Sequence, residues 1–308
     1  MQAVQTSFVV EITLKRFDKI GLATALCITL LVLSSSDLQS QNNQEIFIKA
    51  PWKTESIEKD VTHFNHHFEQ DSIFNSKQNI HYIQIKLSKA KKSLAIARAD
   101  SGMVLTSILA QKSEAIAAIN GSFFNTKTGV SVNFIKINGR VTDSTFYEDK
   151  QKDLKANQQG VLVFDSTGIE IISRNFEDKY WWVNGLKYEN ALESGPLLIK
   201  DNISKIPADT PFSKNRHPRS AVCLTDDSFI LLTADGRNTN AYGLSVDELT
   251  HMLTWLNCKD ALNLDGGGST TLFIKKYGVV NMPSDNKQWD HEGERAVNNA
   301  LLILPSHN

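Results

Sequence analysis

The chain has 308 residues, of which 41% are hydrophobic and 22% are charged, a balance that is ordinary for a globular protein with a substantial core. Its 33 basic and 34 acidic side chains give a net charge of -1, so no basic excess is available to neutralise the phosphates of a nucleic acid. We therefore expect a globular protein of one large domain with no nucleic-acid partner.

The N-terminal residues have the layout of a secretory signal. Three basic residues between positions 15 and 19 precede an uncharged run at 20–33, and a polar stretch follows. The run is shorter than the roughly 20 apolar residues that a membrane span needs. We expect residues 1–40 to be a signal peptide with a short N-terminal extension, cleaved between Asp37 and Asn42, and the mature chain to be periplasmic or secreted. An uncleaved anchor is the alternative, and it would be the chain's contact with a membrane.

Residues 41–79 are polar, and we interpret them as a separate, partly helical N-terminal segment. They contain HFNHHFEQ at 63–70, where His63, His66 and His67 lack a carboxylate or cysteine partner at helical spacing. This pattern favours an exposed helix face over a metal site. No residue spacing in the chain calls for a metal ion or another cofactor, so we expect none.

From Ile80 the sequence becomes typical of strands. Apolar residues alternate over 80–87, and LAIARAD at 94–100 follows a lysine-rich stretch that we interpret as a turn. Residues 106–115 predict a short helix, which leads into the buried strand AIAAIN at 115–120.

Turn residues then recur between apolar segments. Asn138-Gly139, the stretch Asp165–Gly168 and Asp226-Asp227 each separate two apolar segments, which predicts three hairpins. We therefore expect an α+β fold that is rich in strands, with mixed sheets and a few packed helices, forming a single catalytic domain over residues 80–308.

One helix is strongly indicated after residue 244. Ser245 and Glu248 have the spacing of a capping box, in which each side chain bonds the other's main-chain N–H. Its apolar residues fall on one face, which predicts packing against a sheet; they are Leu249, Met252, Leu253 and Leu256.

Two cysteines follow the signal segment. Cys223 and Cys258 form an even pair, which in an oxidising compartment is able to close a disulfide. Two buried free thiols are an equally good interpretation, because a buried cysteine behaves as a small hydrophobic residue. Neither cysteine has the spacing of a zinc ligand.

The stretch NLDGGGSTT is the first candidate site. An apolar strand ends at Asp265, and three glycines, Gly266, Gly267 and Gly268, precede Ser269 and Thr270. Consecutive glycines are costly to order unless a ligand or another main chain approaches closely. The stretch lacks the lysine of a P-loop and the spacing of a dinucleotide site. A tight turn between two strands is the alternative, but two residues would suffice for it.

A second loop, INGSFF, follows the strand that ends at Asn120. Gly121 allows a sharp turn, Ser122 offers a hydroxyl, and Phe123 is able to provide an aromatic platform for a sugar ring.

Glu193, in ALESGPLL, lies among apolar residues. Partial burial would raise its pKa, as a general acid requires. A surface glutamate before a turn is the alternative.

Two arginines mark the ends of one predicted hairpin. Arg219 begins its first strand, and Asp235 and Arg237 follow its second strand at a glycine turn. The planar guanidinium group suits a bidentate grip on phosphate or carboxylate. Arg295, just before the last strand, is able to pair with Asp265 or to reach a substrate.

Together these motifs resemble the phosphodiester glycosidase family. INGSFF, ESGPLL, HPRSAV, ADGR, GLSVDELTHML and NLDGGGSTT occur in this order over roughly residues 80–305. INGSFF departs from the family, which more often has a second glycine before the phenylalanines. The resemblance implies an exported hydrolase that cleaves the anomeric C–O bond of a sugar-1-phosphodiester or related glycan, with a free sugar and a phosphomonoester as products. It also implies a bare catalytic domain of a bacterial type, without cysteine-rich modules.

With this chemistry in mind, we expect Asp265 to be the carboxylate at the anomeric centre, with Glu193 or Asp235 as its partner. Arg219, Arg237 and the main chain of 266–269 would hold the phosphate. Asn120 and Asn263 would bind sugar hydroxyls. Two alternatives are a glycan-binding or exopolysaccharide-assembly protein without turnover, and a phosphodiesterase that cuts the P–O bond.

Overall fold

The computed structural model describes residues 39–143, 159–174, 186–205 and 209–305. The chain divides into two compact units, residues 1–48 and 49–308. The described part of the first unit, residues 39–48, is helical. The predicted signal peptide lies almost entirely outside the described residues. No helix in the described part of the chain has the length and apolar character needed to cross a membrane.

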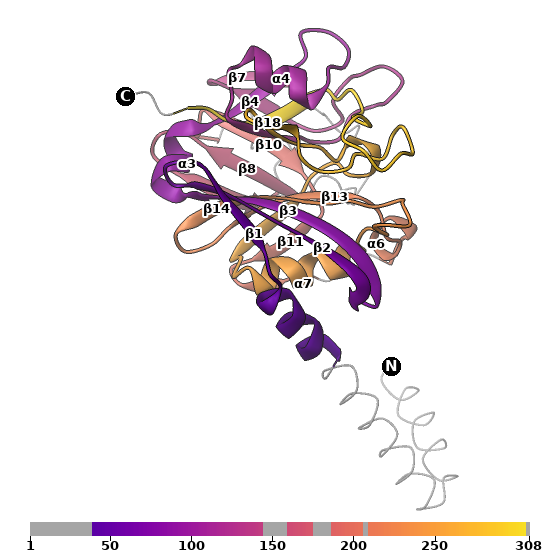
Figure 1. Ribbon diagram of the computed structural model, residues 1–308. Coiled ribbons are helices and arrows are strands. Elements are labelled where there is room, and N and C mark those ends of the chain that lie inside the picture. Colours follow the sequence, from indigo (N-terminus) through magenta and orange to yellow (C-terminus); the bar gives the residue numbers. More distant parts are fainter. Residues whose placement is uncertain (1–38, 144–158, 175–185, 206–208, 306–308) are drawn as a thin grey trace, which may run out of the picture. The chain divides into compact units, whose positions relative to one another are not determined.

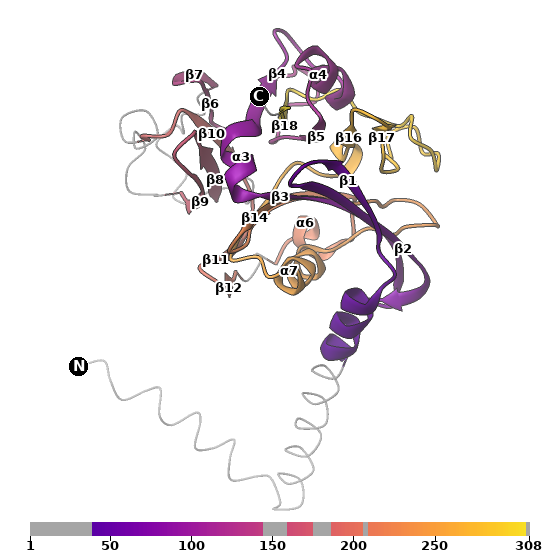
Figure 2. The same cartoon turned by 60° about the vertical axis from the view of Figure 1, so that its left-hand side comes forward.

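Within the described residues of the second unit, the strands form three sheets (Figures 1 and 2). The largest has the order β1-β2-β3-β14-β13-β15-β11-β12, and the other two have the orders β7-β6-β10-β8-β9 and β17-β16-β5-β18-β4. The strands of the largest sheet are β1 Lys53–Glu58, β2 Val61–Ile73, β3 Ser76–Lys86, β11 Leu197–Lys200, β12 Ile203–Ser204, β13 Arg219–Leu224, β14 Ser228–Ala234 and β15 Asp260–Asn263. The strands of the second sheet are β6 Ile135–Ile137, β7 Arg140–Asp143, β8 Gly160–Phe164, β9 Ile169–Ser173 and β10 Asn190–Ser194. The strands of the third are β4 Leu94–Arg98, β5 Ala117–Asn120, β16 Leu272–Ile274, β17 Gly278–Val279 and β18 Asn299–Ile303.

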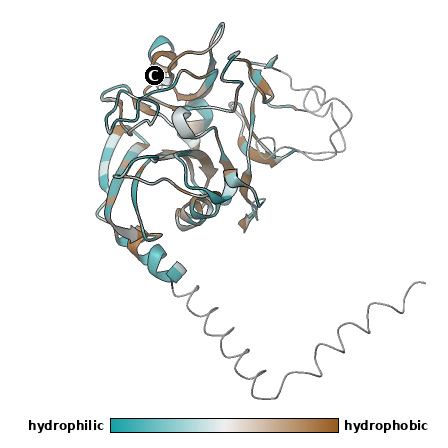
Figure 3. Cartoon of the chain, turned by 90° about the vertical axis from the view of Figure 1, so that its right-hand side faces the viewer, coloured by the Kyte–Doolittle hydropathy of each residue, from teal (hydrophilic) through white to brown (hydrophobic). Residues whose placement is uncertain are grey.

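The three sheets share one hydrophobic core. Ile83 and Leu231 from the largest sheet, Leu162 from the second, and Ile119 and Leu301 from the third belong to the same buried cluster. Helix α7 (Val246–Trp255) lies on the opposite face of the largest sheet, and α4 (Thr106–Lys112) covers the outer side of β5 and β18 (Figures 1 and 2). In Figure 3 the apolar segments lie mostly in strands and the loops are mostly hydrophilic. The remaining helices are α3 Leu87–Ser93, α6 Pro211–Lys214 and the 3-10 turn η2 Gly267–Ser269.

The predicted α+β class and its richness in strands are confirmed. The described strand pairs are antiparallel, where the sequence predicted mixed sheets. All three predicted hairpins form, as β6–β7, β8–β9 and β13–β14. The capping box of α7 is also confirmed, because Glu248 N donates to Ser245 Oγ at 3.1 Å and Ser245 N donates to Glu248 Oε2 at 2.9 Å.

The interpretation of residues 63–70 as an exposed helix face is wrong. These residues belong to β2, which pairs with β3 along most of its length. Side chains of the two strands pack against each other: the Phe64 ring stacks on Tyr82 with centroids 4.6 Å apart, and buried His63 contacts His81. The eight-stranded sheet therefore begins at Lys53, inside the segment that the sequence suggested to be separate. The predicted lysine-rich turn after β3 is helix α3.

Of the two interpretations of the cysteines, the disulfide is the one observed. Cys223 of β13 is bonded to Cys258, just after α7, with a Cα–Cα distance of 5.7 Å. Both residues are buried. The bond fastens the C-terminal end of α7 to the middle of the largest sheet.

Candidate active site

The two predicted loops meet at the ends of β5 and β15. Asn120 Nδ2 donates to Asp265 O at 2.6 Å, and Asp265 N donates to Gly121 O at 3.0 Å. Asn120 Oδ1 accepts hydrogen bonds from Ser220 Oγ and Thr271 N. Asn120 is fully buried, and both the nitrogen and the oxygen of its side-chain amide are hydrogen-bonded within the protein. It therefore joins the two loops, and the prediction that it binds sugar hydroxyls is not supported by this geometry.

The glycines let other groups lie directly on the loop. A Cβ at Gly266 would be 2.7 Å from Pro218 O, and a Cβ at Gly267 would be 2.8 Å from Arg237 Nη2. Gly267 also has a φ of +61°, which disfavours other residues. A Cβ at Gly268 would collide with the Asp285 carboxylate and with the Arg295 guanidinium that it pairs with. Two cationic side chains are thus packed against the main chain of the glycine loop.

Arg237 is placed as a ligand-binding residue would be. It is exposed, and its side chain has no hydrogen-bond or ion-pair partner among the described residues. Its φ of 60° is unusual for a residue with a side chain, and such strain is concentrated at functional sites. Arg295 differs, because its Nε donates to Asp285 Oδ2 at 3.1 Å. The predicted Arg295–Asp265 pair is therefore replaced by an Arg295–Asp285 pair beside the loop.

Asp265 is the titratable group at the centre of this arrangement. Burial raises its pKa from 3.8 to about 6, while the neighbouring Ser269 hydroxyl, the Gly266 N–H, Arg295 and Arg237 favour the ionised form. Gly266 N donates to Asp265 Oδ1 at 3.0 Å. A carboxyl group that titrates near pH 6 beside a cation without a partner among the described residues, here Arg237, is suited to act as a base or nucleophile.

Asp235, predicted as a catalytic partner, is buried with both oxygens occupied. Asn281 Nδ2 donates to Oδ1 at 2.8 Å, and Asn79 Nδ2 and Met282 N donate to Oδ2 at 2.7 and 3.0 Å. Burial raises the pKa of Asp235 to about 6. The carboxyl group ties β3 and the segment that begins at Asn281 to the end of β14, so it acts as an anchor and presents no free oxygen to a substrate.

A buried chain of amide and imidazole groups extends from this anchor. The second N–H of Asn79 Nδ2 contacts His81 Nε2 at 3.2 Å, and His81 Nδ1 contacts His63 Nε2 at 3.2 Å. Because the amide is a donor, we assign the His81 proton to Nδ1 and make His63 Nε2 the acceptor. Burial lowers the pKa of His81 to about 3 and that of His63 to about 4, so both rings are neutral.

Glu193 is also withdrawn from the solvent. It is fully buried in β10, its Oε1 pairs with Arg174 Nη1 at 2.7 Å, and its Oε2 accepts from Phe134 N at 2.8 Å. Asn133 Nδ2 also reaches Oε2, and Asn133 Oδ1 accepts from Phe123 N. Glu193 therefore positions the strand beside the Phe123 loop, and the expected partly buried general acid is not found at this position.

Arg219 does not present its guanidinium group to a phosphate. It is 1% exposed. Its Nε donates to Leu244 O at 2.9 Å, and its Nη2 donates to Phe212 O at 2.7 Å and to Asn215 O at 3.1 Å. The guanidinium also lies 4.7 Å from the Phe212 ring centroid. Arg219 thus closes the turn around α6 and leaves Arg237 as the available arginine of the predicted pair.

Three further predicted substrate contacts are internal. Ser122 N donates to Asn299 Oδ1, and Asn263 Nδ2 donates to Gly195 O and Leu264 O, so these residues brace the loops. Thr270 is buried, and its hydroxyl has no hydrogen-bond partner within the described residues. Phe123 is half-buried and lies 6.2 Å from the Phe212 ring, centroid to centroid, which keeps it available as an apolar edge.

His217 was not predicted as a site residue. It is half-buried, and burial together with the charges of Arg219 and Arg237 lowers its pKa, which keeps the imidazole neutral. Its neighbour Pro218 accepts a hydrogen bond from Gly267 N, so His217 is one residue away from a contact of the glycine loop. The HPR motif was visible in the sequence, but nothing local distinguished His217 from its neighbours. Among the described residues, no group of three or more His, Cys, Asp or Glu is arranged to hold a metal ion.

The chain is similar in sequence to a known family and in fold to solved structures. Residues 113–304 match the sequence profile of the family described as phosphodiester glycosidase. The catalytic domain of zebrafish N-acetylglucosamine-1-phosphodiester alpha-N-acetylglucosaminidase, auto-inhibited by its pro-peptide, is 18% identical and has a TM-score of 0.65, covering 83% of this chain and 88% of that one. A hypothetical protein from Synechocystis is 17% identical with a TM-score of 0.59, covering 82% of this chain and 63% of that one. At these identities the structures show a shared fold.

One curated relative is also similar in sequence. The SPbeta prophage-derived uncharacterized protein YomE of Bacillus subtilis (strain 168) is 24% identical over 200 residues. The match covers 63% of this chain but 29% of the relative, so the chain spans less than a third of that protein's length.

The ion pair of Glu193 leads to a stability prediction. We expect Glu193→Gln to lower the free energy of unfolding by about 3–5 kcal/mol, because the Arg174 guanidinium is then buried beside a neutral amide. Urea titration followed by tryptophan fluorescence measures this loss. The double variant Glu193→Leu/Arg174→Met removes both charges and should recover most of it. A Glu193→Gln protein with wild-type stability and no turnover would return Glu193 to a catalytic role.

Proposed function

Because the chain belongs to the phosphodiester glycosidase family, we propose that it is an exported hydrolase that cleaves the anomeric C–O bond of a sugar-1-phosphodiester or a related glycan. The products are a free sugar and a phosphomonoester. The observation that carries this proposal is the half-buried Asp265, whose pKa is raised to about 6, on a glycine loop that is packed against Arg237 and Arg295.

In this reaction the phosphate of the substrate lies against the cationic groups. Arg237 has no protein partner in the described part of the chain and is free to grip phosphate oxygens. Of the main-chain N–H groups in the loop, those of Gly266, Gly267 and Ser269 are used internally. The N–H of Gly268 is the remaining main-chain donor of these four, and we propose that it binds a phosphate oxygen.

Asp265 acts at the anomeric carbon. Bond cleavage creates an oxocarbenium-like centre, which a carboxylate stabilises as a nucleophile or by activating water. A phosphate leaving group needs little protonation, so cations can replace a general acid. The proposed reaction therefore does not need Glu193 or Asp235 as a general acid, and both of these carboxylates are used in internal hydrogen bonds. His217 precedes Pro218, which bonds the loop, and its lowered pKa would suit the imidazole to accept a proton from the attacking water.

Export is part of the proposal. The basic flank, the apolar run and the polar exit before residue 42 favour a cleaved signal, and the Cys223–Cys258 disulfide fits an oxidising compartment. We expect amino-terminal sequencing of the mature protein to find its first residue between Asp37 and Asn42. A cytoplasmic protein that begins with the initiator methionine would contradict export.

The bond that is cut is tested with isotopic water. In ¹⁸O-labelled water we expect the label in the sugar, because C–O cleavage adds water at the anomeric carbon; label in the phosphate would mean P–O cleavage.

Asp265→Asn should lower kcat by about 10²–10⁴-fold. Asp165→Asn, in the exposed β8–β9 turn, is the matched control and should retain activity. Near-full activity in Asp265→Asn would overturn its role, and a wild-type protein that binds glycans without any turnover would favour a binding function.

The charge of Arg237 should be visible in the pH profile. Activity needs ionised Asp265, so kcat/KM should fall as the pH drops below about 6. Arg237→Gln removes a charge that lowers the pKa of Asp265, so the acidic limb should move to higher pH. Arg237→Lys keeps the positive charge, so the acidic limb of its pH profile should stay where it is in the wild type. Its KM for phosphodiesters should rise, while its KM for an uncharged aryl glycoside should not change. An unmoved limb in Arg237→Gln would mean that another group titrates.

A further inference from the structure

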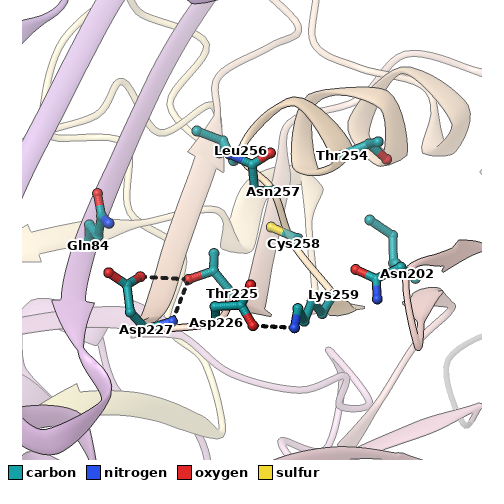
Figure 4. Close-up of a pocket in the computed structure, with 11 residues that line it drawn as sticks. Gln84, Asn202, Thr225, Asp226, Asp227, Thr254, Leu256, Asn257, Cys258 and Lys259 are labelled. Atoms are coloured by element: carbon teal, nitrogen blue, oxygen red, sulfur yellow. Dashed lines mark hydrogen bonds and ion pairs between the residues drawn. The ribbon is translucent and has the colours of Figure 1, made fainter.

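A second site lies far from the glycine loop. A cavity of about 510 Å³ is lined by the turn 225–227 between β13 and β14, by Thr254 and residues 256–259 around the end of α7, by Asn202 after β11 and by Gln84 of β3 (Figure 4). The glycine loop lies at the other end of β13, β14 and β15. Because β14 has seven residues, each advancing about 3.3 Å, the two sites are on the order of 20 Å apart.

The charges of this cavity exclude an anionic ligand. Lys259 pairs with Asp226, which neutralises both (Figure 4). Asp227 is left as a carboxylate, and its Oδ1 accepts from Ser228 Oγ at 2.8 Å and from Thr225 Oγ1 at 3.1 Å. The C-terminal end of α7 adds a partial negative charge. The cavity is therefore negative, and the phosphate of the substrate proposed above would be repelled here.

Its neutral groups suit a polyhydroxylated molecule. The side chains of Asn202 and Asn257 have no partners in the described part of the chain, and each amide offers both donors and an acceptor. Ile199, Leu256 and the disulfide at Cys258 supply apolar surface beside them. A sugar ring likewise combines polar and apolar surface, with hydroxyl groups on its edge and C–H groups on its faces. A volume of about 300–1,000 Å³ is typical of small-molecule sites.

The walls are held rigidly before any ligand arrives. Lys259 N donates to Leu224 O at 2.7 Å, and Asn202 N donates to Lys259 O at 2.9 Å. The disulfide fixes the same stretch to β13. A preformed cavity loses little conformational entropy when a ligand binds, which favours affinity.

We propose that this cavity is a second carbohydrate-binding site, which takes an uncharged saccharide unit of a glycan. The proposal rests on the cavity alone and stands whether or not the glycine loop catalyses hydrolysis.

Saturation-transfer NMR on the purified full-length chain tests it, with the neutral tetrasaccharides chitotetraose and cellotetraose as probes. The key variant is Asn202→Gly/Asn257→Gly. Both residues have left-handed backbones, with φ of 63° and 59°, so glycine keeps the turns and removes only the amides. Asn138→Gly is the matched control, because Asn138 has a φ of 49° in the β6–β7 turn. We expect the wild type to bind at least one probe, and the double variant to bind it about tenfold more weakly or worse.

Asn138→Gly and Asp265→Asn should bind the probe as the wild type does, and unchanged melting temperatures will show that the variants are folded. Three results would overturn the proposal: transfer to neither probe in the wild type, equal affinity in the double variant, or loss of binding in Asp265→Asn. The last would place the saccharide at the glycine loop. Loss of phosphodiester hydrolysis by itself bears on the proposed function and not on this cavity.

Discussion

Two hydrogen bonds hold the end of β5 against the end of β15, although these strands belong to different sheets. They join Asn120 Nδ2 to Asp265 O and Asp265 N to Gly121 O. Close neighbours on either side leave no room for side chains at these turns: a Cβ at Gly121 would meet Asn299, and one at Gly266 would meet Pro218. The glycines therefore allow each strand to end against its neighbours, and the loop that follows Gly266 packs against Arg237 and Arg295.

Buried polar groups stabilise the segments around this point. Glu193, Arg219 and Asp235 lie in or next to strands, and each satisfies main-chain or amide groups of a neighbouring segment. A buried charge without partners would be costly, so these side chains determine where the loops run. These three side chains are buried, whereas Asp265 is half-buried and Arg237 is exposed, so only the last two remain accessible to a ligand.

The strands β13, β14 and β15 connect two polar regions. At one end Arg237 and Arg295 surround Asp265, and at the other Asp227 lies beside the end of α7. The disulfide and the capped helix α7 hold the second region in place, while Asp235 and Asn281 hold the first. Each region therefore has its own support, and the chemistry of one does not constrain that of the other.

From the sequence alone, the hairpins, the α7 capping box, the α+β class and the family could be predicted, because these signals act within a few residues. Local patterns misassigned residues 63–70, whose strand depends on pairing with β3. Which carboxylates remain accessible was decided only by the tertiary structure. Asp235 is bonded by Asn79, 156 positions away, and Glu193 by Arg174 on the far side of a hairpin. Burial and partners of this kind arise from packing between distant segments, so Asp265 remained accessible while the two other predicted carboxylates became internal supports.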